Sequence, residues 1–214
     1  TRIETVKTGW PSYAPCGTNG EIVVAHQSGT LPLVVSKRET KGSGSWTETL
    51  LPPPSGASGM LWPRMISTGP DNNTIHIIAL TAPTGNGGTV YQGLDGALLY
   101  CRSTDGGATF SDWQLFPELS NNYYLGFGGD SYGWLIPYEN HLAFVITDSD
   151  KDLIIMHSSD NGETWEKLIV WEHPYPFFSS SMVTDRFYCP DGSAHGAIDK
   201  YGKIHLAFGV NRAY

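Results

Sequence analysis

Short apolar runs recur along this chain, and each follows a turn dipeptide and alternates between apolar and polar positions. Four of these runs align on Ile22, Ile75, Leu142 and Ile204, at steps of 53, 67 and 62 residues. Strict alternation is the pattern of a half-buried strand, and no segment of useful length shows a helical period. With 25 glycines and 14 prolines between and around the runs, the pattern predicts an all-β chain made of four related units.

Each unit carries further short strands around the aligned run. We expect an inner strand before the turn dipeptide, at 10–14, 62–66, 132–136 and 182–188. A third strand follows in three units, at 31–36, 97–103 and 152–158, and a fourth begins at or close to an aromatic residue, at 46–50, 113–116 and 165–170. Four short antiparallel strands form one blade of a β-propeller, and the spacing of the units is typical of such blades with loop insertions.

An eight-residue signature, Ser-x-Asp-x-Gly-x-Thr-aromatic, occurs twice, at 103–110 and 158–165. The Asp can accept N–H bonds from the residues that follow it, the Gly can take positive φ, and the Ser and Thr add hydroxyl bonds. The closing aromatic is large enough to anchor the hairpin to its sheet. The residues to which we assign this structural role are Ser103, Asp105, Gly107, Thr109, Phe110, Ser158, Asp160, Gly162, Thr164 and Trp165.

This signature resembles the Asp-box, or BNR, repeat of sialidase-like β-propellers. The resemblance implies a propeller of four-stranded antiparallel blades in which the box is a folding device. We therefore assign neither Asp105 nor Asp160 a catalytic or calcium-binding role, because the turn already uses their oxygens. After Ser36 the first unit has a degenerate box, in which we expect Gly42 and Gly44 to keep the turn geometry in place of a carboxylate.

The length of 214 residues supplies three full blades and the first two strands of a fourth. We expect one β-propeller portion, with blades at approximately 10–50, 61–117, 131–171 and 180–214. The resemblance implies more blades than these, and a radial array needs closure to hide its sheet edges. We therefore expect a piece of a longer polypeptide, completed by further residues or by another protein chain.

The charge, hydrophobic runs and cysteines of the chain limit the classes of ligand and partner that it can bind. The formal net charge is −8 and the longest cluster of basic residues is Lys37-Arg38, which excludes nucleic acid as a main ligand. The longest purely apolar stretches, such as 142–146, are far shorter than the roughly 20 residues that span a bilayer. The three cysteines have no metal-binding spacing, so we expect neither a metal nor a cofactor. The Asp-box resemblance and the low lysine content favour a secreted or cell-surface protein.

Ligands of propellers usually meet the mouth of the central channel, which the inner strands and their loops line. The charged residues of the expected inner strands are Arg64, Asp185 and Arg186, and Trp134 and Tyr138 are aromatic candidates for stacking on sugar rings. By the resemblance, an arginine in the channel can clamp a carboxylate, as the arginine cluster of sialidases clamps sialic acid. The alternatives are an arginine paired within the propeller and aromatic residues that pack between blades.

The catalytic pattern of the resembled enzymes is not found in this sequence. Sialidases carry an arginine in a Phe/Tyr-Arg-Ile-Pro segment, with a Tyr nucleophile, a Glu partner and an Asp acid, whereas the nearest segment here is Trp-Pro-Arg-Met at 62–65. Catalytic residues therefore stay unknown, and the pattern does not favour an enzyme. We expect an extracellular or cell-surface module for the recognition of glycans or proteins, or for scaffolding.

Two other functions stay open. A glycoside hydrolase of the sialidase-like type would turn over a fluorogenic glycoside and lose that activity when Arg64 or Asp185 is changed to Ala. A surface adhesin or secreted cargo of a bacterial secretion pathway would use the propeller as a carried module. Fold analogy alone does not decide between these functions.

Overall fold

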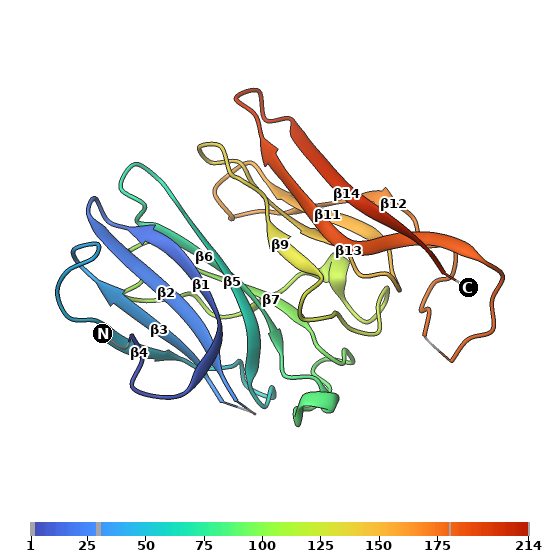
Figure 1. Ribbon diagram of the computed structural model, residues 1–214, viewed down its shortest axis with the longest axis horizontal. Coiled ribbons are helices and arrows are strands. Elements are labelled where there is room, and N and C mark those ends of the chain that lie inside the picture. Colours follow the sequence, from blue (N-terminus) through green and yellow to red (C-terminus); the bar gives the residue numbers. More distant parts are fainter. Residues whose placement is uncertain (1–2, 29–30, 180, 214) are drawn as a thin grey trace. The chain divides into compact units, whose positions relative to one another are not determined.

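The computed structural model describes residues 3–28, 31–179 and 181–213. Its strands form three four-stranded antiparallel sheets and one two-stranded hairpin, which confirms the predicted all-β class (Figure 1). The chain divides into two compact units between Ser120 and Asn121, and each is described by itself. Within each sheet the strands follow one another in chain order, as in a propeller blade.

Unit 1 contains two complete sheets. The first is formed by β1 (Thr8–Cys16), β2 (Gly20–Gln27), β3 (Leu33–Arg38) and β4 (Thr47–Leu51), and the second by β5 (Met60–Thr68), β6 (Thr74–Thr81), β7 (Leu98–Ser103) and β8 (Gln114–Leu115). Two short 3₁₀ turns, η1 (Thr84–Asn86) and η2 (Pro117–Leu119), lie in its loops. The second strands are buried along almost their whole length, because both faces of a blade are covered by neighbours.

Unit 2 contains the third sheet and the hairpin. The sheet is formed by β9 (Tyr132–Trp134), β10 (Leu142–Ile146), β11 (Leu153–Ser158) and β12 (Glu166–Trp171), and the hairpin by β13 (Phe187–Ile198) and β14 (Ile204–Ala213). One side of β14 packs on the third sheet, where the Phe208 ring lies 6.2 Å from the Trp171 ring. The two ends of the fourth predicted blade, residues 180 and 214, lie outside the described residues.

The inner strand predicted at 182–188 is wrong. The strand begins at Phe187 and continues to Ile198, where it turns into β14. The Pro-Asp-Gly segment at 190–192 has the composition of a turn but forms a bulge, at which the pairing shifts between Pro190 and Ala194. A Pro-Asp-Gly segment suits either a turn or a bulge, since both need a break in the ladder, so its composition alone does not show that the strand continues through it.

Both Asp-boxes use their carboxylates inside the hairpin. Asp160 Oδ1 accepts the N–H groups of Glu163 and Thr164 at 3.0 and 2.9 Å, and its Oδ2 accepts the Thr164 hydroxyl at 2.6 Å. Asp105 makes the same three bonds with Ala108 and Thr109. These bonds hold the pKa of each carboxyl at about 2, the Ser103 hydroxyl being the largest cause for Asp105 and the Thr164 hydroxyl for Asp160.

The degenerate first box keeps a carboxylate after all, from another strand. Glu21, buried at the start of β2, accepts the Gly42 N–H at 3.0 Å and pairs with the guanidinium of Arg38. The prediction that glycine alone replaces the carboxylate is therefore incomplete. Gly42 and Gly44 do take φ values of 75° and 85°, and Glu21 supplies the missing acceptor.

Candidate functional site

The two inner strands of unit 1 carry the same irregularity at the same place. Trp10 and Pro11 of β1 lie opposite one residue of β2, and Trp62 and Pro63 of β5 lie opposite one residue of β6. Proline suits such a bulge because it lacks the N–H that a regular ladder needs. Both tryptophans have a φ of 49°. This left-handed conformation costs about 1–3 kcal/mol for a residue with a side chain and persists only where the surroundings hold it.

A buried histidine lies between the two tryptophans. The ring of His26, on β2, is 5.1 Å from that of Trp10 and 6.0 Å from that of Trp62. Its Nδ1 accepts the backbone N–H of Trp62 at 2.9 Å, so the neutral imidazole carries its proton on Nε2. Gly9 permits the close approach of the ring, since a Cβ at this position would lie 3.3 Å from Nε2.

The charge of this region comes from Arg64. Burial lowers the pKa of His26, and the nearby positive charge of Arg64 lowers that pKa further. At neutral pH the imidazole is therefore uncharged and the guanidinium is the cation. Arg64 is half-buried on β5, and its Nη1 donates a hydrogen bond to the Pro63 carbonyl at 3.3 Å.

The same strands are tied together beside this group. The Met65 N–H donates to Ser12 Oγ at 2.9 Å, so β1 and β5 are joined through a side chain as well as through His26. Trp10 remains 51% exposed, whereas His26 is 8% exposed. The Asp-box hairpin at 103–110 lies at the other end of these strands, where the Gly106 N–H donates to the Asn73 carbonyl.

We call Trp10, His26, Trp62 and Arg64 the bulge site. It combines an accessible indole, a neutral imidazole fixed in one tautomer and a guanidinium. An indole can stack on the apolar face of a ring, and a guanidinium can bind a carboxylate or hydroxyl groups. The arrangement is therefore suited to binding a ligand that has both a ring face and polar oxygens.

The predicted site residues divide between the two units. Arg64 lies in the bulge site of unit 1, and the other four lie in unit 2. Trp134 is partly exposed, and its ring lies 5.5 Å from that of Phe144 and 6.2 Å from that of Trp165. Tyr138 is 36% exposed. Asp185 and Arg186 are exposed and precede β13, in the segment that the sequence wrongly assigned to an inner strand.

Sequence reasoning missed His26 and gave Trp10 no place among the site residues. The signal was present as the Trp-Pro dipeptide, which occurs at 10–11 and again at 62–63, at equivalent places in the repeat. A repeated X-Pro inside a strand indicates a bulge. The position of His26 between the two bulges depends on how two separate sheets pack, which no local pattern contains.

A second polar cluster, in unit 2, is structural. Asp152 accepts the N–H of His173 at 2.8 Å and the hydroxyl of Tyr124 at 2.9 Å. Burial and then the neighbouring Asp152 raise the pKa of Tyr124. The His173 ring packs against Phe178 and Phe187 at 5.3 and 5.0 Å. The carboxylate is thus used to fix a loop.

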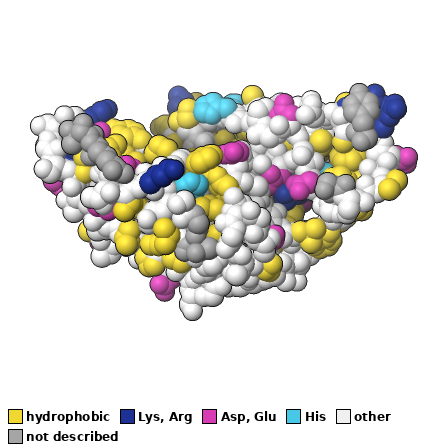
Figure 2. Space-filling model, turned by 60° about the horizontal axis from the view of Figure 1, so that its bottom comes forward, with side chains coloured by type: hydrophobic (Ala, Val, Ile, Leu, Met, Phe, Trp, Pro, Cys, Tyr) yellow, Lys and Arg dark blue, Asp and Glu magenta, His cyan; other side chains and the backbone are white. Residues whose placement is uncertain are grey.

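On the face that Figure 2 shows, Lys and Arg side chains lie in small separate groups. Within residues 3–28, 31–179 and 181–213, no three His, Cys, Asp or Glu side chains are arranged to hold a metal ion. In the same ranges the structure has no helix of the length and apolar character that a membrane span requires.

No protein-family model and no curated protein matches the chain. Solved structures do match it. Hadza microbial sialidase Hz136 has a TM-score of 0.56 and 19% identity, over 96% of this chain and 44% of its own. A protein of unknown function from Dyadobacter fermentans has a TM-score of 0.59 and 14% identity, over 95% and 62%. A leech intramolecular trans-sialidase has a TM-score of 0.56 and 14% identity, over 96% and 48%.

These similarities establish the fold. At such identities they confirm the predicted sialidase-like β-propeller architecture and carry no statement about activity. The chain spans 44% to 62% of the length of these three proteins. Its sheets therefore correspond to part of each of those structures.

Proposed function

We propose that this chain is part of an extracellular or cell-surface β-propeller that recognises glycans, with the bulge site as the contact. The observation that carries this proposal is the matched pair of left-handed tryptophans. Each bulge costs free energy, and together they hold an accessible indole over a buried neutral imidazole beside a guanidinium. Backbone strain of this kind is concentrated at ligand-binding and active sites.

A sialylated glycan is the first probe to use. The leech trans-sialidase with a similar fold was solved with 2,7-anhydro-Neu5Ac. In the present chain the indole of Trp10 would stack on the C–H face of a sugar, and Arg64 would bind a carboxylate or hydroxyl groups. Further residues of the polypeptide, or another protein chain, would complete the propeller around this site.

The test is calorimetric titration of the protein with 3′-sialyllactose and with lactose. Trp10→Ala should weaken binding about two- to tenfold, the range expected for one lost stacking contact. Arg64→Gln should remove the preference for the sialylated sugar. The control is Tyr201→Ala, which changes an aromatic side chain that is 75% exposed in unit 2. Unchanged affinity in both bulge-site variants would contradict the proposal.

The same protein should be tested for hydrolysis. A fluorogenic sialoside that is turned over by the parent chain, and not by Arg64→Ala or Asp185→Ala, would replace recognition with a glycoside hydrolase function. Display of the full-length polypeptide on a bacterial surface, with no glycan bound in either titration, would favour the adhesin or cargo alternative. A purely structural role would stand if partner subunits covered the bulge site.

A further inference from the structure

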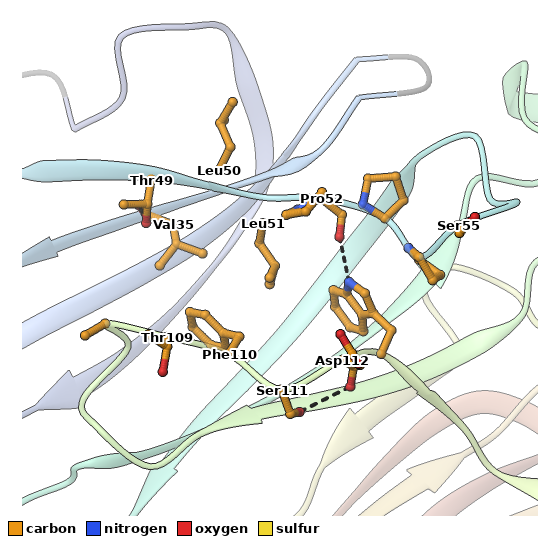
Figure 3. Close-up of a pocket in the computed structure, with 14 residues that line it drawn as sticks. Val35, Thr49, Leu50, Leu51, Pro52, Ser55, Thr109, Phe110, Ser111 and Asp112 are labelled. Atoms are coloured by element: carbon orange, nitrogen blue, oxygen red, sulfur yellow. Dashed lines mark hydrogen bonds between the residues drawn. The ribbon is translucent and has the colours of Figure 1, made fainter.

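Unit 1 contains a groove at its outer strands, on residues that are distinct from the bulge site. It has a volume of about 680 Å³ and lies between the first sheet and the Asp-box hairpin of the second (Figure 3). The wall on the first sheet is formed by Val35, Thr49, Leu50, Leu51, Pro52, Pro53, Pro54 and Ser55. The wall on the second sheet is the continuous segment 108–113. The volume falls within the range of about 300–1,000 Å³ that small-molecule sites occupy.

Both walls are held in place without a ligand. The Trp113 Nε1–H donates to the Pro52 carbonyl at 2.8 Å and so joins the two walls. Asp105 fixes Thr109 through its N–H and its hydroxyl. Ser111 Oγ accepts the Arg102 N–H at 3.1 Å. Three consecutive prolines further limit the backbone of the first wall. A ligand would therefore meet a preformed surface, which reduces the entropic cost of binding.

The lining combines ring surfaces with oxygen atoms. The Phe110 ring faces Val35 and Leu51 across the groove in Figure 3. Trp113 adds a second aromatic ring to the lining. Hydroxyl groups come from Thr49, Ser55, Thr109 and Ser111. The mixture of aromatic faces and fixed oxygens matches a sugar, which has an apolar C–H face and a ring of hydroxyl groups.

The charge of the lining selects among sugars. Asp112 is the only charged residue among the fourteen that line the groove, and none of them is Lys, Arg or His. A carboxylate accepts hydrogen bonds from neighbouring hydroxyl groups of a neutral sugar, and it repels the carboxylate of an acidic one. The groove and the bulge site thus differ in the sign of their charge, since the bulge site carries Arg64.

We propose that this groove is a second carbohydrate site, specific for one or two rings of a neutral glycan. The sugar ring packs its C–H face on Phe110 and Trp113. Asp112 and the nearby hydroxyls of Thr109 and Ser111 bind its hydroxyl groups. The site does not depend on the proposed function of the bulge site, because the two share no residue.

The test is saturation-transfer NMR and calorimetric titration of the protein with lactose, maltose and 3′-sialyllactose. We expect a neutral disaccharide to bind, and Asp112→Asn to weaken that binding about fivefold or more through loss of a charge-assisted hydrogen bond. Glu172→Gln, which makes the same chemical change at an exposed residue of unit 2, should have no effect. Trp10→Ala should leave this binding intact, which separates the groove from the bulge site.

Three results would overturn the proposal. The first is that the Asp112→Asn variant binds each of the neutral disaccharides with the same affinity as the parent protein. The second is binding of 3′-sialyllactose alone, abolished by Trp10→Ala, which would place all sugar binding at the bulge site. The third is binding of a lysine- and proline-containing peptide in the groove when no neutral disaccharide binds there, which would make the groove a peptide site.

Discussion

Removing one Asp-box carboxylate tests whether the box stabilises the fold. Asp160 accepts four hydrogen bonds, from Ser158 Oγ at 2.8 Å, the Glu163 and Thr164 N–H groups at 3.0 and 2.9 Å, and Thr164 Oγ1 at 2.6 Å. A protein hydrogen bond contributes about 0.5–1.5 kcal/mol net, and partners near the surface can turn to water instead. We therefore expect Asp160→Ala to cost about 2 kcal/mol, the low end of that sum.

Asparagine separates geometry from charge at this position. Asp160→Asn keeps one oxygen for Ser158 Oγ and the two N–H groups, but it loses the second acceptor and the negative charge that strengthens all four bonds. We therefore expect about half the cost of the alanine variant. The folded pKa of Asp160 is lowered from 3.8 to about 2. The carboxylate's contribution is thus complete above pH 3.8 and is lost as the pH falls towards 2, because the unfolded chain binds the proton first. The difference in the free energy of unfolding between the parent and the Asn variant should become smaller as the pH falls from 3.8 to about 2.

The assay is urea unfolding followed by tryptophan fluorescence, for which Trp165 in the same box is a reporter. Trp165 packs 5.5 Å from Phe144, so opening of the hairpin changes its surroundings. Ser159→Ala is the control, because Ser159 is exposed and occupies a position of the same box at which the signature accepts any residue. If Asp160→Ala unfolds at the same urea concentration as Ser159→Ala, the carboxylate does not stabilise the fold and the reasoning is refuted.

Three further predictions concern other elements. Glu21→Gln should lower the urea midpoint of unit 1, because the Gly42 turn loses its charged acceptor; an unchanged midpoint would contradict the role given to Glu21. His26 has a lowered pKa, so the unfolded chain protonates first and stability should fall as the pH drops below about 6.5; NMR titration of the imidazole checks this, and a pKa above the ordinary value would be inconsistent with it. Gly196→Ala should disrupt the β13–β14 hairpin, since a Cβ there would lie 2.2 Å from the His205 carbonyl; hydrogen exchange of the β14 amides should accelerate, and parent-like protection would refute the clash.

The parts of the fold that depend on local rules were predictable from the sequence. Alternating runs gave the second strands, and the box signature gave the sites of two hairpins, because each box forms its hydrogen bonds within eight residues. The errors lie where one local pattern suits two structures. Pro190 and the residues after it satisfy a turn and a bulge equally well, and the choice depends on pairing with β14, more than ten residues away.

The candidate sites were less predictable, for the same physical reason. Arg64 was found because a charge within an inner strand is conspicuous, whereas His26 gains its surroundings from β5 of another sheet. Trp134 was predicted as a candidate for stacking on sugar rings, and its ring lies 6.2 Å from that of Trp165. Whether an aromatic side chain faces solvent or a neighbouring blade depends on packing between sheets, on which strand alternation gives no information.

The carboxylate that Glu21 supplies to the first hairpin has a consequence for how such modules are counted. Its acceptor oxygen reaches the Gly42 N–H from twenty-one residues earlier in the chain, so the hairpin has a carboxylate acceptor although it lacks the motif itself. A hairpin of this kind can thus form without the signature, provided that another strand supplies the carboxylate. A search for repeats by motif matching alone misses this hairpin, and an acidic residue near the start of the second strand of the blade, as Glu21 is in β2, is the feature that identifies it.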